Sequence, residues 1–396
     1  MRTCGCNSVR RACALIAAAI IASGCNYASM GPNQSAPPAP VAATASPPEQ
    51  TPIQEPLRSG LARENYYRAL LKLPPVAEDR ALSKGAEMHA RYVVKNHLRG
   101  GEASLSNGRL GINRPDSEVR REDPKNPWYT EAGANAANIS PYVMTGSVLP
   151  DKGEFVVDQV LTLPFSAILA LDPQVSAIGY GQYCEAQECA AVLSIKHGLD
   201  KPVFASLYEG AVARLWNPAN GPMPLTPARL RVPLEFPPPG ATVELTSYAG
   251  NGWPDPLMSC AGYEVPTGPP IILELGQGLG ANGMVEVDGH SLSDGKDDLS
   301  NCLLDSTSFY PNEQRQQDQA LAEPSQPPTN DQEKAKQEKA RIARDQRANG
   351  SFLLGYYGAV IMIPRAPLKP GSTYSVSITA DSKRYDWSFA VAASSK

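Results

Sequence analysis

The sequence predicts an α+β protein with two domains, and three observations lead to this interpretation. Residues from 57 to about 210 mix helical periodicity with short strands. After Asn217, short apolar runs are separated by Pro, Gly and Asn, as in an all-β sandwich. A chain of 396 residues is also longer than one hydrophobic core usually supports. We therefore expect one domain at 57–217 and a second at 218–396.

The beginning of the chain predicts export. Two arginines precede an apolar run at 12–21, which is shorter than the roughly 20 residues that a membrane-spanning helix needs. A basic start, a short apolar core and small residues before a break are typical of a secretory signal, here 1–24.

Cys25 directly follows Ala22-Ser23-Gly24. This segment resembles the bacterial lipobox, whose cysteine receives a diacylglycerol anchor and becomes the first mature residue. The next residue is Asn26 and not an aspartate, so we expect lipid anchoring at the outer membrane, facing the periplasm. An ordinary cleaved signal followed by an unrelated cysteine is the alternative.

The mature chain is acidic and begins with a polar segment. Residues 25–56 are rich in Pro, Ala, Ser and Gln, which predicts a flexible tether. Removing 1–24 takes away three arginines, so the formal charge changes from −4 to −7. We therefore expect no nucleic-acid partner, because phosphate binding depends on clustered Lys and Arg.

Four cysteines follow Cys25 in the mature chain. An even number in an exported protein predicts two disulfides. Proximity in the sequence favours Cys184–Cys189 and Cys260–Cys302. A metal site on the first pair is disfavoured, because a single histidine, His197, lies near it and thiols are oxidised outside the cytosol.

Periodicity and breakers predict the elements of both domains. Helices are expected from about 57 to 73 and at 79–96, 129–139 and 153–163. Residues 99–128 are expected to form a surface loop. Strands are expected at 175–183, 190–195, 203–208, 230–236, 242–247, 271–275, 284–287, 359–363, 374–379 and 387–391. A charged insertion at 311–349 interrupts the second domain, and its half at 331–347 fits a solvated helix.

Several segments of the first domain occur in the order found in one known family. They are Asn65-Tyr66-Tyr67-Arg68, Leu73-Pro74-Pro75-Val76, Leu82 to Ala86 with His89-Ala90, Tyr129 to Ala137, Pro164-Phe165-Ser166, Leu171-Asp172-Pro173 and Ile178-Gly179-Tyr180-Gly181. Together they resemble the CAP superfamily of cysteine-rich secretory, antigen 5 and pathogenesis-related proteins. The resemblance covers about 57–210 and implies an α-β-α sandwich with a central cleft.

The resemblance also implies a cleft in which two histidines and two glutamates hold a divalent ion, and this chain departs from that set. One glutamate position falls on Ala134, one histidine position on Ser166, and the other histidine position on Arg120. Methyl, hydroxyl and guanidinium groups do not replace imidazole and carboxylate as metal ligands. We therefore expect no metal, no cofactor and no catalysis at this cleft.

His89, Glu122 and Glu131 complete the candidates for lining the cleft. His89 lies on the apolar side of its helix, so a buried structural role is the first interpretation and a cleft role the second. Glu122 in a loop and Glu131 at a helix start need no function. A hydrolase dyad of Ser166 and His89 is disfavoured, because no Gly-x-Ser-x-Gly elbow surrounds the serine.

The last part of the chain resembles the final strands of bacterial Ig-like modules. The resemblance rests on Ala359 to Pro364, Pro367 to Val376, and Trp387 to Val391. Pro370-Gly371 predicts a turn, and the alternating residues 374, 376 and 378 predict one buried face. Nearby, Asp288, Asp294, Asp297 and Asp298 lack the spacing of an EF-hand and are interpreted as a solvated turn rather than a calcium site.

These features together predict a non-catalytic envelope lipoprotein. Its lipid would hold it at the membrane, and its degenerate cleft or its Ig-like module would bind a lipid, a glycan or an envelope protein. A hydrolase that uses the cleft and a structural envelope spacer are the two alternatives. Fold analogy alone does not choose between a spacer and a binding surface.

Overall fold

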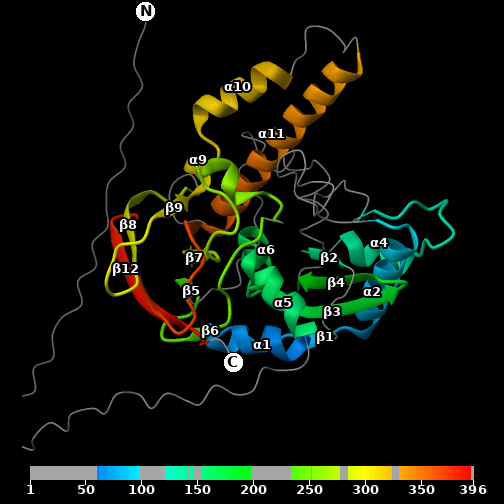
Figure 1. Cartoon of the computed structure of the whole chain (residues 1–396), viewed down its shortest axis with the longest axis horizontal. Helices are drawn as coiled ribbons and strands as arrows, with labels where there is room; N and C mark the ends of the chain where they lie inside the picture. The colour runs from blue at the N-terminus through cyan, green and yellow to red at the C-terminus, as the bar shows by residue number, and fades with distance from the viewer. Residues whose placement is uncertain are drawn as a thin grey trace, which may run out of the picture. The chain divides into compact units, whose positions relative to one another are not determined.

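The computed structural model describes residues 60–98, 119, 121–138, 140, 142–146, 153–197, 233–250, 252–276, 284–322 and 330–393. All of them belong to one compact unit that begins at Ile53 (Figure 1). The predicted signal, the tether, Arg120, the strand at 203–208 and the domain boundary near 217 lie outside the described residues.

A four-stranded sheet organises the first part of the chain. Its strand order is β1 (Ala77–Glu78), β3 (Val175–Glu185), β4 (Glu188–His197) and β2 (Tyr142–Gly146). The predicted hairpin is confirmed, since β3 and β4 are antiparallel and Cys184 lies opposite Cys189. The sequence did not predict β1 or β2. β1 has two residues, which is too short to show alternation, and it pairs with β3 about a hundred positions later.

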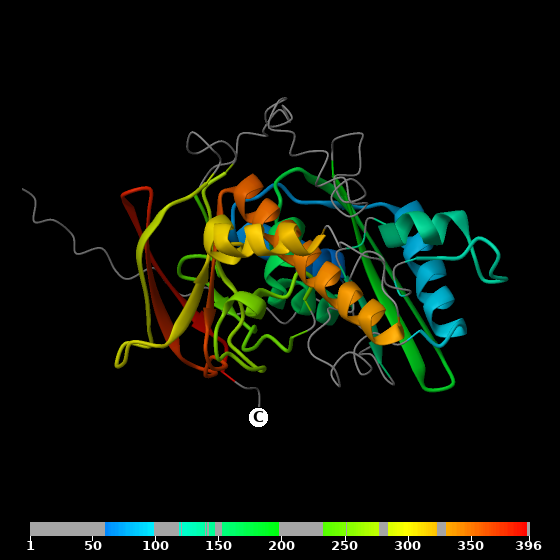
Figure 2. The same cartoon turned by 90° about the horizontal axis from the view of Figure 1, so that it is seen from above.

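Helices α2 (Arg80–Lys95) and α4 (Glu131–Asn138) lie against one side of this sheet (Figures 1 and 2). α2 begins at its cap Asp79, whose carboxylate accepts the N–H groups of Ala81 and Leu82. Two glycines of β3 let the helix lie close to the strand. A Cβ at Gly181 would lie 2.0 Å from the main-chain nitrogen of Glu87, and one at Gly179 would lie 2.6 Å from Leu82. The close packing of α2 on β3 therefore explains why glycines occupy positions 179 and 181.

Helices α1 (Gly60–Leu70), α5 (Gly153–Thr162) and α6 (Pro164–Ala170) lie on the other side. α6 was not predicted as a helix, although Pro164 at its first position suits a helix start. Among the described helices, none alone is long and apolar enough to cross a bilayer. The bent pair α5 and α6 passes that test jointly, by length and composition.

The second part of the chain contains two more four-stranded sheets. One has the order β5 (Leu234–Phe236), β7 (Ile271–Glu274), β10 (Ala359–Pro364) and β9 (Asn301–Leu304). The other has the order β6 (Thr242–Val243), β12 (Lys383–Val391), β11 (Thr373–Ala380) and β8 (Val287–Ser293). The predicted alternation in β11 is confirmed, since Tyr374, Val376 and Ile378 are buried. The strand expected at 284–287 is observed as β8, which begins at Val287, the last residue of the expected range.

Three helices accompany these sheets. α9 (Ser306–Phe309) is a short helix that the sequence did not predict. The charged insertion forms α10 (Asn312–Ala322) and α11 (Asp331–Tyr357). The first turns of α11 are exposed, as expected for 331–347. The helix continues beyond 349, and its last turns bury Leu353 and Leu354 before Gly358 ends it with a left-handed φ of 55°.

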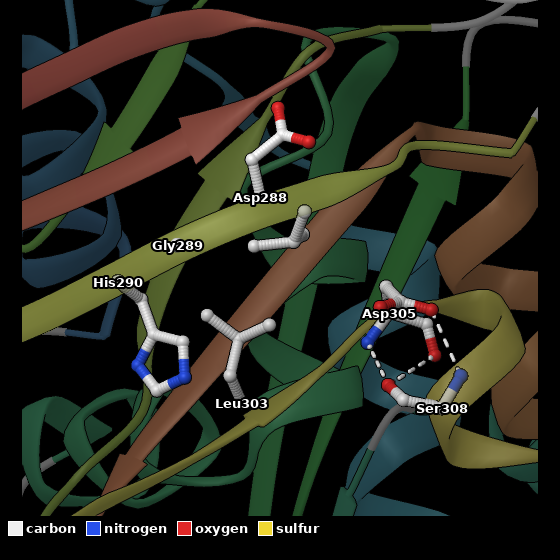
Figure 3. Close-up of a pocket in the computed structure, with 7 residues that line it drawn as sticks. Asp288, Gly289, His290, Leu303, Asp305 and Ser308 are labelled. Atoms are coloured by element: carbon white, nitrogen blue, oxygen red, sulfur yellow. Dashed lines mark hydrogen bonds between the residues drawn. The ribbon is translucent and has the colours of Figure 1, made fainter.

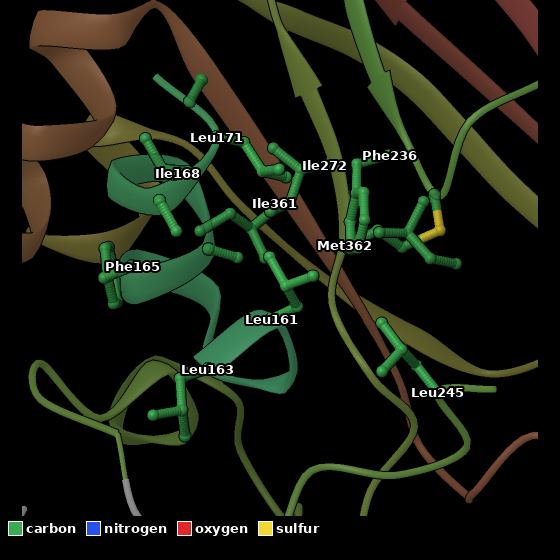
Figure 4. Close-up of a cluster of buried hydrophobic side chains, with 14 of the residues drawn as sticks. Leu161, Leu163, Phe165, Ile168, Leu171, Phe236, Leu245, Ile272, Ile361 and Met362 are labelled. Atoms are coloured by element: carbon green, nitrogen blue, oxygen red, sulfur yellow. The ribbon is translucent and has the colours of Figure 1, made fainter. Parts of the chain in front are cut away.

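The two predicted domains share one hydrophobic core. Leu161, Ile168 and Leu171 of the α5–α6 region belong to the same buried cluster as Ile272 of β7 and Ile361 of β10 (Figure 4). The rings of Phe165 in α6 and Phe309 in α9 also pack edge to face, with centroids 5.2 Å apart. Apolar burial therefore joins the CAP-like segment to the sheets that follow it.

Candidate functional site

His89 is the sequence-predicted site residue with the clearest environment. It lies on α2 and its side chain is fully buried. Its Nδ1 is 3.0 Å from Oε1 of Glu122, and its Nε2 is 2.8 Å from the carbonyl oxygen of Val119. Because a carbonyl oxygen can only accept, Nε2 carries a proton. The expectation of a buried structural histidine agrees with these contacts.

Glu122 completes a closed network around this histidine. Its other oxygen, Oε2, accepts the N–H of Thr130 at 2.9 Å. Gly133 makes room for the carboxylate, because a Cβ there would lie 2.3 Å from Oε1. Both imidazole nitrogens and both carboxylate oxygens are thus used in holding residues 119–133 against α2.

Among the described residues, the other candidates, Glu131, Ala134 and Ser166, are not part of this network. Glu131 is exposed in the first turn of α4, and Ala134 is partly exposed on the same helix. Ser166 is 5% exposed in α6, which lies across the sheet from α2 (Figures 1 and 2). A dyad of Ser166 with His89 is therefore inconsistent with the fold. Of the five candidates that the structure describes, it joins His89 and Glu122.

Within the described ranges, no group of three or more His, Cys, Asp and Glu side chains is arranged to hold a metal ion. The aspartates considered for calcium instead stabilise turns. Oδ1 of Asp294 accepts the N–H groups of Lys296 and Asp297, at 3.1 and 3.0 Å. Asp288 accepts the N–H of Ser382. These contacts fit the expected solvated turn.

A second buried polar cluster lies between the two parts of the chain. Tyr357 of α11 donates its hydroxyl to Oδ2 of Asp172 at 2.7 Å. Arg68 donates to the carbonyl oxygen of Asp172 at 3.1 Å and lies 3.9 Å from Glu64. Glu274 of β7 is 1% exposed and interacts electrostatically with Asp172. The sequence analysis missed this cluster, although Arg68 and Asp172 stand in segments that it singled out.

Burial changes the protonation of this cluster. It raises the pKa of Glu64 to about 7, an effect that the nearby Arg68 opposes. It also raises the pKa of Glu274 well above the usual range, and the carboxylate of Asp172 adds to the effect. Among the described residues, neither oxygen of Glu64 has a hydrogen-bond partner. Protons held by these carboxyls therefore stabilise the folded chain.

The structure also outlines a groove away from the CAP-like candidates. It is about 520 Å³ in volume and lies between β8 and β9 (Figure 3). Its lining residues come from β8, β9 and the start of α9, and they are Val287, Asp288, Gly289, His290, Leu303, Asp305 and Ser308.

Both predicted disulfides are formed. Cys184 is bonded to Cys189 across the β3–β4 hairpin, and Cys260 is bonded to Cys302 at the start of β9. The second bond connects residues 42 positions apart within the second part of the chain. No disulfide among the described residues joins the two parts.

Comparison with known proteins gives one informative result. A search of curated proteins finds no match. Residues 61–193 match the family model of CAP, the Cysteine-rich secretory protein family. The matched segment extends from α1 into β4 and contains the His89–Glu122 pair and all but the last residues of the first sheet. Because the match coincides with the segment that resembles this family, it supports placing residues 61–193 in the CAP superfamily.

Proposed function

We propose that this protein is a non-catalytic envelope lipoprotein that binds a component of the cell envelope. One observation supports the non-catalytic part most directly. The closed network of His89 and Glu122 uses all four of their polar side-chain atoms within the protein. In this network neither nitrogen of His89 is left for general acid–base chemistry or for metal binding.

Three further points support a binding role. The CAP match is compatible with a binding role in general terms. Ser166, at the position of a family histidine, is buried and remote from His89. The two sheets of the second part fit an Ig-like sandwich, a class of module that acts as a spacer or a binding surface. In this proposal Cys25 anchors the protein at the outer membrane, where it faces the periplasm.

The proposal is tested with the unlipidated Cys25→Ser chain, so that the anchor does not dominate binding. The protein is sedimented with purified peptidoglycan sacculi, with vesicles of phosphatidylethanolamine and phosphatidylglycerol, and with immobilised envelope proteins. We expect saturable binding to one of these three, with no release of soluble fragments. Matched assays with Ser166→Ala and His89→Gln test for chemistry.

Two outcomes contradict the proposal. Turnover of sacculi or lipid that is lost in Ser166→Ala would favour a hydrolase. No binding to any of the three would favour a structural spacer. Both variants need a check of folding by circular dichroism, because both residues are buried.

A further inference from the structure

β8 is an edge strand of one C-terminal sheet, and β9 is an edge strand of the other. A tight turn connects them, and the two strands diverge directly beyond it. The N–H of Leu299 donates to the carbonyl of Leu292 at 2.7 Å, and the N–H of Asp294 donates to the carbonyl of Asp297. Beyond these bonds the strands stop pairing. β8 continues along β11, whereas β9 joins β10 in the other sheet. The groove lies in the space that opens between them (Figure 3).

The main chain of His290 faces this groove. In an extended strand, the N–H and C=O groups of alternate residues point to the same edge. The carbonyl of Leu292 is directed at Leu299, on the β9 side. The N–H and C=O of His290, two residues earlier, therefore point to that side and away from β11. No described strand pairs with this edge at His290, and an open strand edge is a template for another extended chain.

The surroundings of this edge are partly apolar, and the hairpin segment that forms it is acidic. Leu303 points into the space between the strands in Figure 3 and is partly exposed, as is Val287. The segment from 286 to 305 contains a single lysine, Lys296, and six carboxylates, which are Glu286, Asp288, Asp294, Asp297, Asp298 and Asp305. Lys369 lies near Asp294, at the turn end of the hairpin. An extended chain with basic side chains complements this charge.

We infer that the β8–β9 groove binds an extended, basic peptide segment of another envelope protein, which pairs with β8 through the main chain of His290. This inference rests on the proposed binding function and assigns it to one surface. Main-chain hydrogen bonds would supply affinity, Leu303 and Val287 an apolar contact, and the carboxylates a preference for Lys or Arg. The CAP-like segment would then position this surface rather than bind the partner itself.

The test uses the Cys25→Ser chain and a fluorescent synthetic peptide in which Lys and Val alternate. We expect saturable binding that weakens with added salt. The same peptide with N-methyl groups on alternate amides cannot donate to the strand edge. It should bind at least about tenfold more weakly, as expected when one or two main-chain hydrogen bonds are lost. A peptide with Glu in place of Lys should not bind.

Two variants of His290 locate the site. His290→Pro removes the N–H that faces the groove, and proline is tolerated on a free strand edge. His290→Ala removes the imidazole and keeps the N–H. We expect the proline variant to lose binding and the alanine variant to retain it. If the proline variant fails to fold, the comparison of the two peptide backbones still decides the question.

Three results would overturn the inference. The first is equal affinity for the N-methylated peptide, and the second is unchanged binding by a folded His290→Pro variant. The third is a dimer in analytical ultracentrifugation that the His290→Pro variant alone does not form. The last result would identify a second copy of the chain as the occupant. Binding of sacculi or vesicles that is unaffected by His290→Pro would overturn the inference and leave the proposed function intact.

Discussion

His89 and Glu122 are 33 residues apart in the sequence, and their side chains are joined in the interior at 3.0 Å. The imidazole belongs to helix α2. The carboxylate belongs to a loop whose sequence shows no helical or strand periodicity. Their contact therefore determines where that loop ends and where α4 begins, because Glu122 also accepts the N–H of Thr130. The pair is a structural connection within the segment that matches the CAP family model.

Replacing His89 with alanine should strongly destabilise the protein. The change leaves the carboxylate of Glu122 buried without its main partner, which typically costs about 3–5 kcal/mol of unfolding free energy. His97 offers a matched control, because it also contacts a glutamate, Glu188 at 2.7 Å, but its side chain is 77% exposed. His97→Ala should cost less than about 1 kcal/mol. Urea unfolding measures both, and equal losses would contradict a structural role for His89.

Glu64→Gln should remove part of the pH dependence of stability. The folded pKa of Glu64 is raised to about 7, so folding binds its proton more tightly. Its contribution is complete below the unfolded pKa near 4.5 and is lost as the pH rises through 7. This shift corresponds to on the order of 3 kcal/mol between pH 4 and pH 8. The free energy of unfolding is measured in urea at both pH values, with the exposed Glu87→Gln variant as the control. If its difference between the two pH values is the same in Glu64→Gln as in the wild type, the raised pKa of Glu64 is refuted.

The two disulfides should stabilise the protein unequally. Cys260–Cys302 closes a loop between residues 42 positions apart, and Cys184–Cys189 closes one between residues five apart. Chain-entropy estimates give about 4 kcal/mol for the longer loop and about 2 kcal/mol for the shorter. Paired serine substitutions, compared by unfolding under non-reducing conditions, should show this order. A reversed order would mean that the native hairpin relies on its cross-strand bond more than loop entropy predicts.

Cys25→Ser should release the protein from the membrane. If Cys25 carries the diacylglycerol anchor, wild-type protein enters the detergent phase and the variant remains soluble or unprocessed. Detergent-phase partitioning of cells that express each form measures the difference, and Cys184→Ser controls for a general effect of losing a thiol. Unchanged partitioning of Cys25→Ser would mean that the signal is of the ordinary cleaved type.

Zinc should not bind tightly to the CAP-like segment. Tight sites need three or four ligands held together, and His89 and Glu122 already contact each other and the main chain. Calorimetry with untagged protein should show no saturable site tighter than roughly 100 µM, or about −5.5 kcal/mol. A one-to-one isotherm that His89→Gln abolishes would instead show that this network opens to admit a metal.

Local signals explain which elements the sequence predicts. α2 was predicted almost to the residue, because Asp79 caps it and its apolar positions repeat at helical spacing. The β3–β4 hairpin and β11 were predicted from alternation and turn residues. β9 was missed because its four residues lie between a solvated turn and a short helix, and its pairing with β10 depends on a segment about 60 positions later.

Contacts between distant segments explain what was missed in the site. The apolar side of α2 placed His89 in the interior, but no periodicity identifies Glu122 as its partner. α5 carries Val156, Val157 and Val160 in near succession, which indicates a helix buried on more than one side. That pattern does not identify the covering elements, which include α1, near the start of the described chain, and β4 of the first sheet. The interaction of the buried Glu274 with Asp172 escapes prediction for the same reason, because it joins segments about a hundred positions apart.

The shared core also constrains the order in which this protein is made. The apolar surface of α5 and α6 is complete once Leu171 has been synthesised, but one of the strands that covers it, β10, begins at Ala359. At ordinary elongation rates, the intervening 187 residues (172–358) take on the order of 10 to 40 s. During that interval a nascent chain exposes Leu161, Ile168 and Leu171 to water and to its neighbours. These side chains are therefore fully covered only after β10 has been completed.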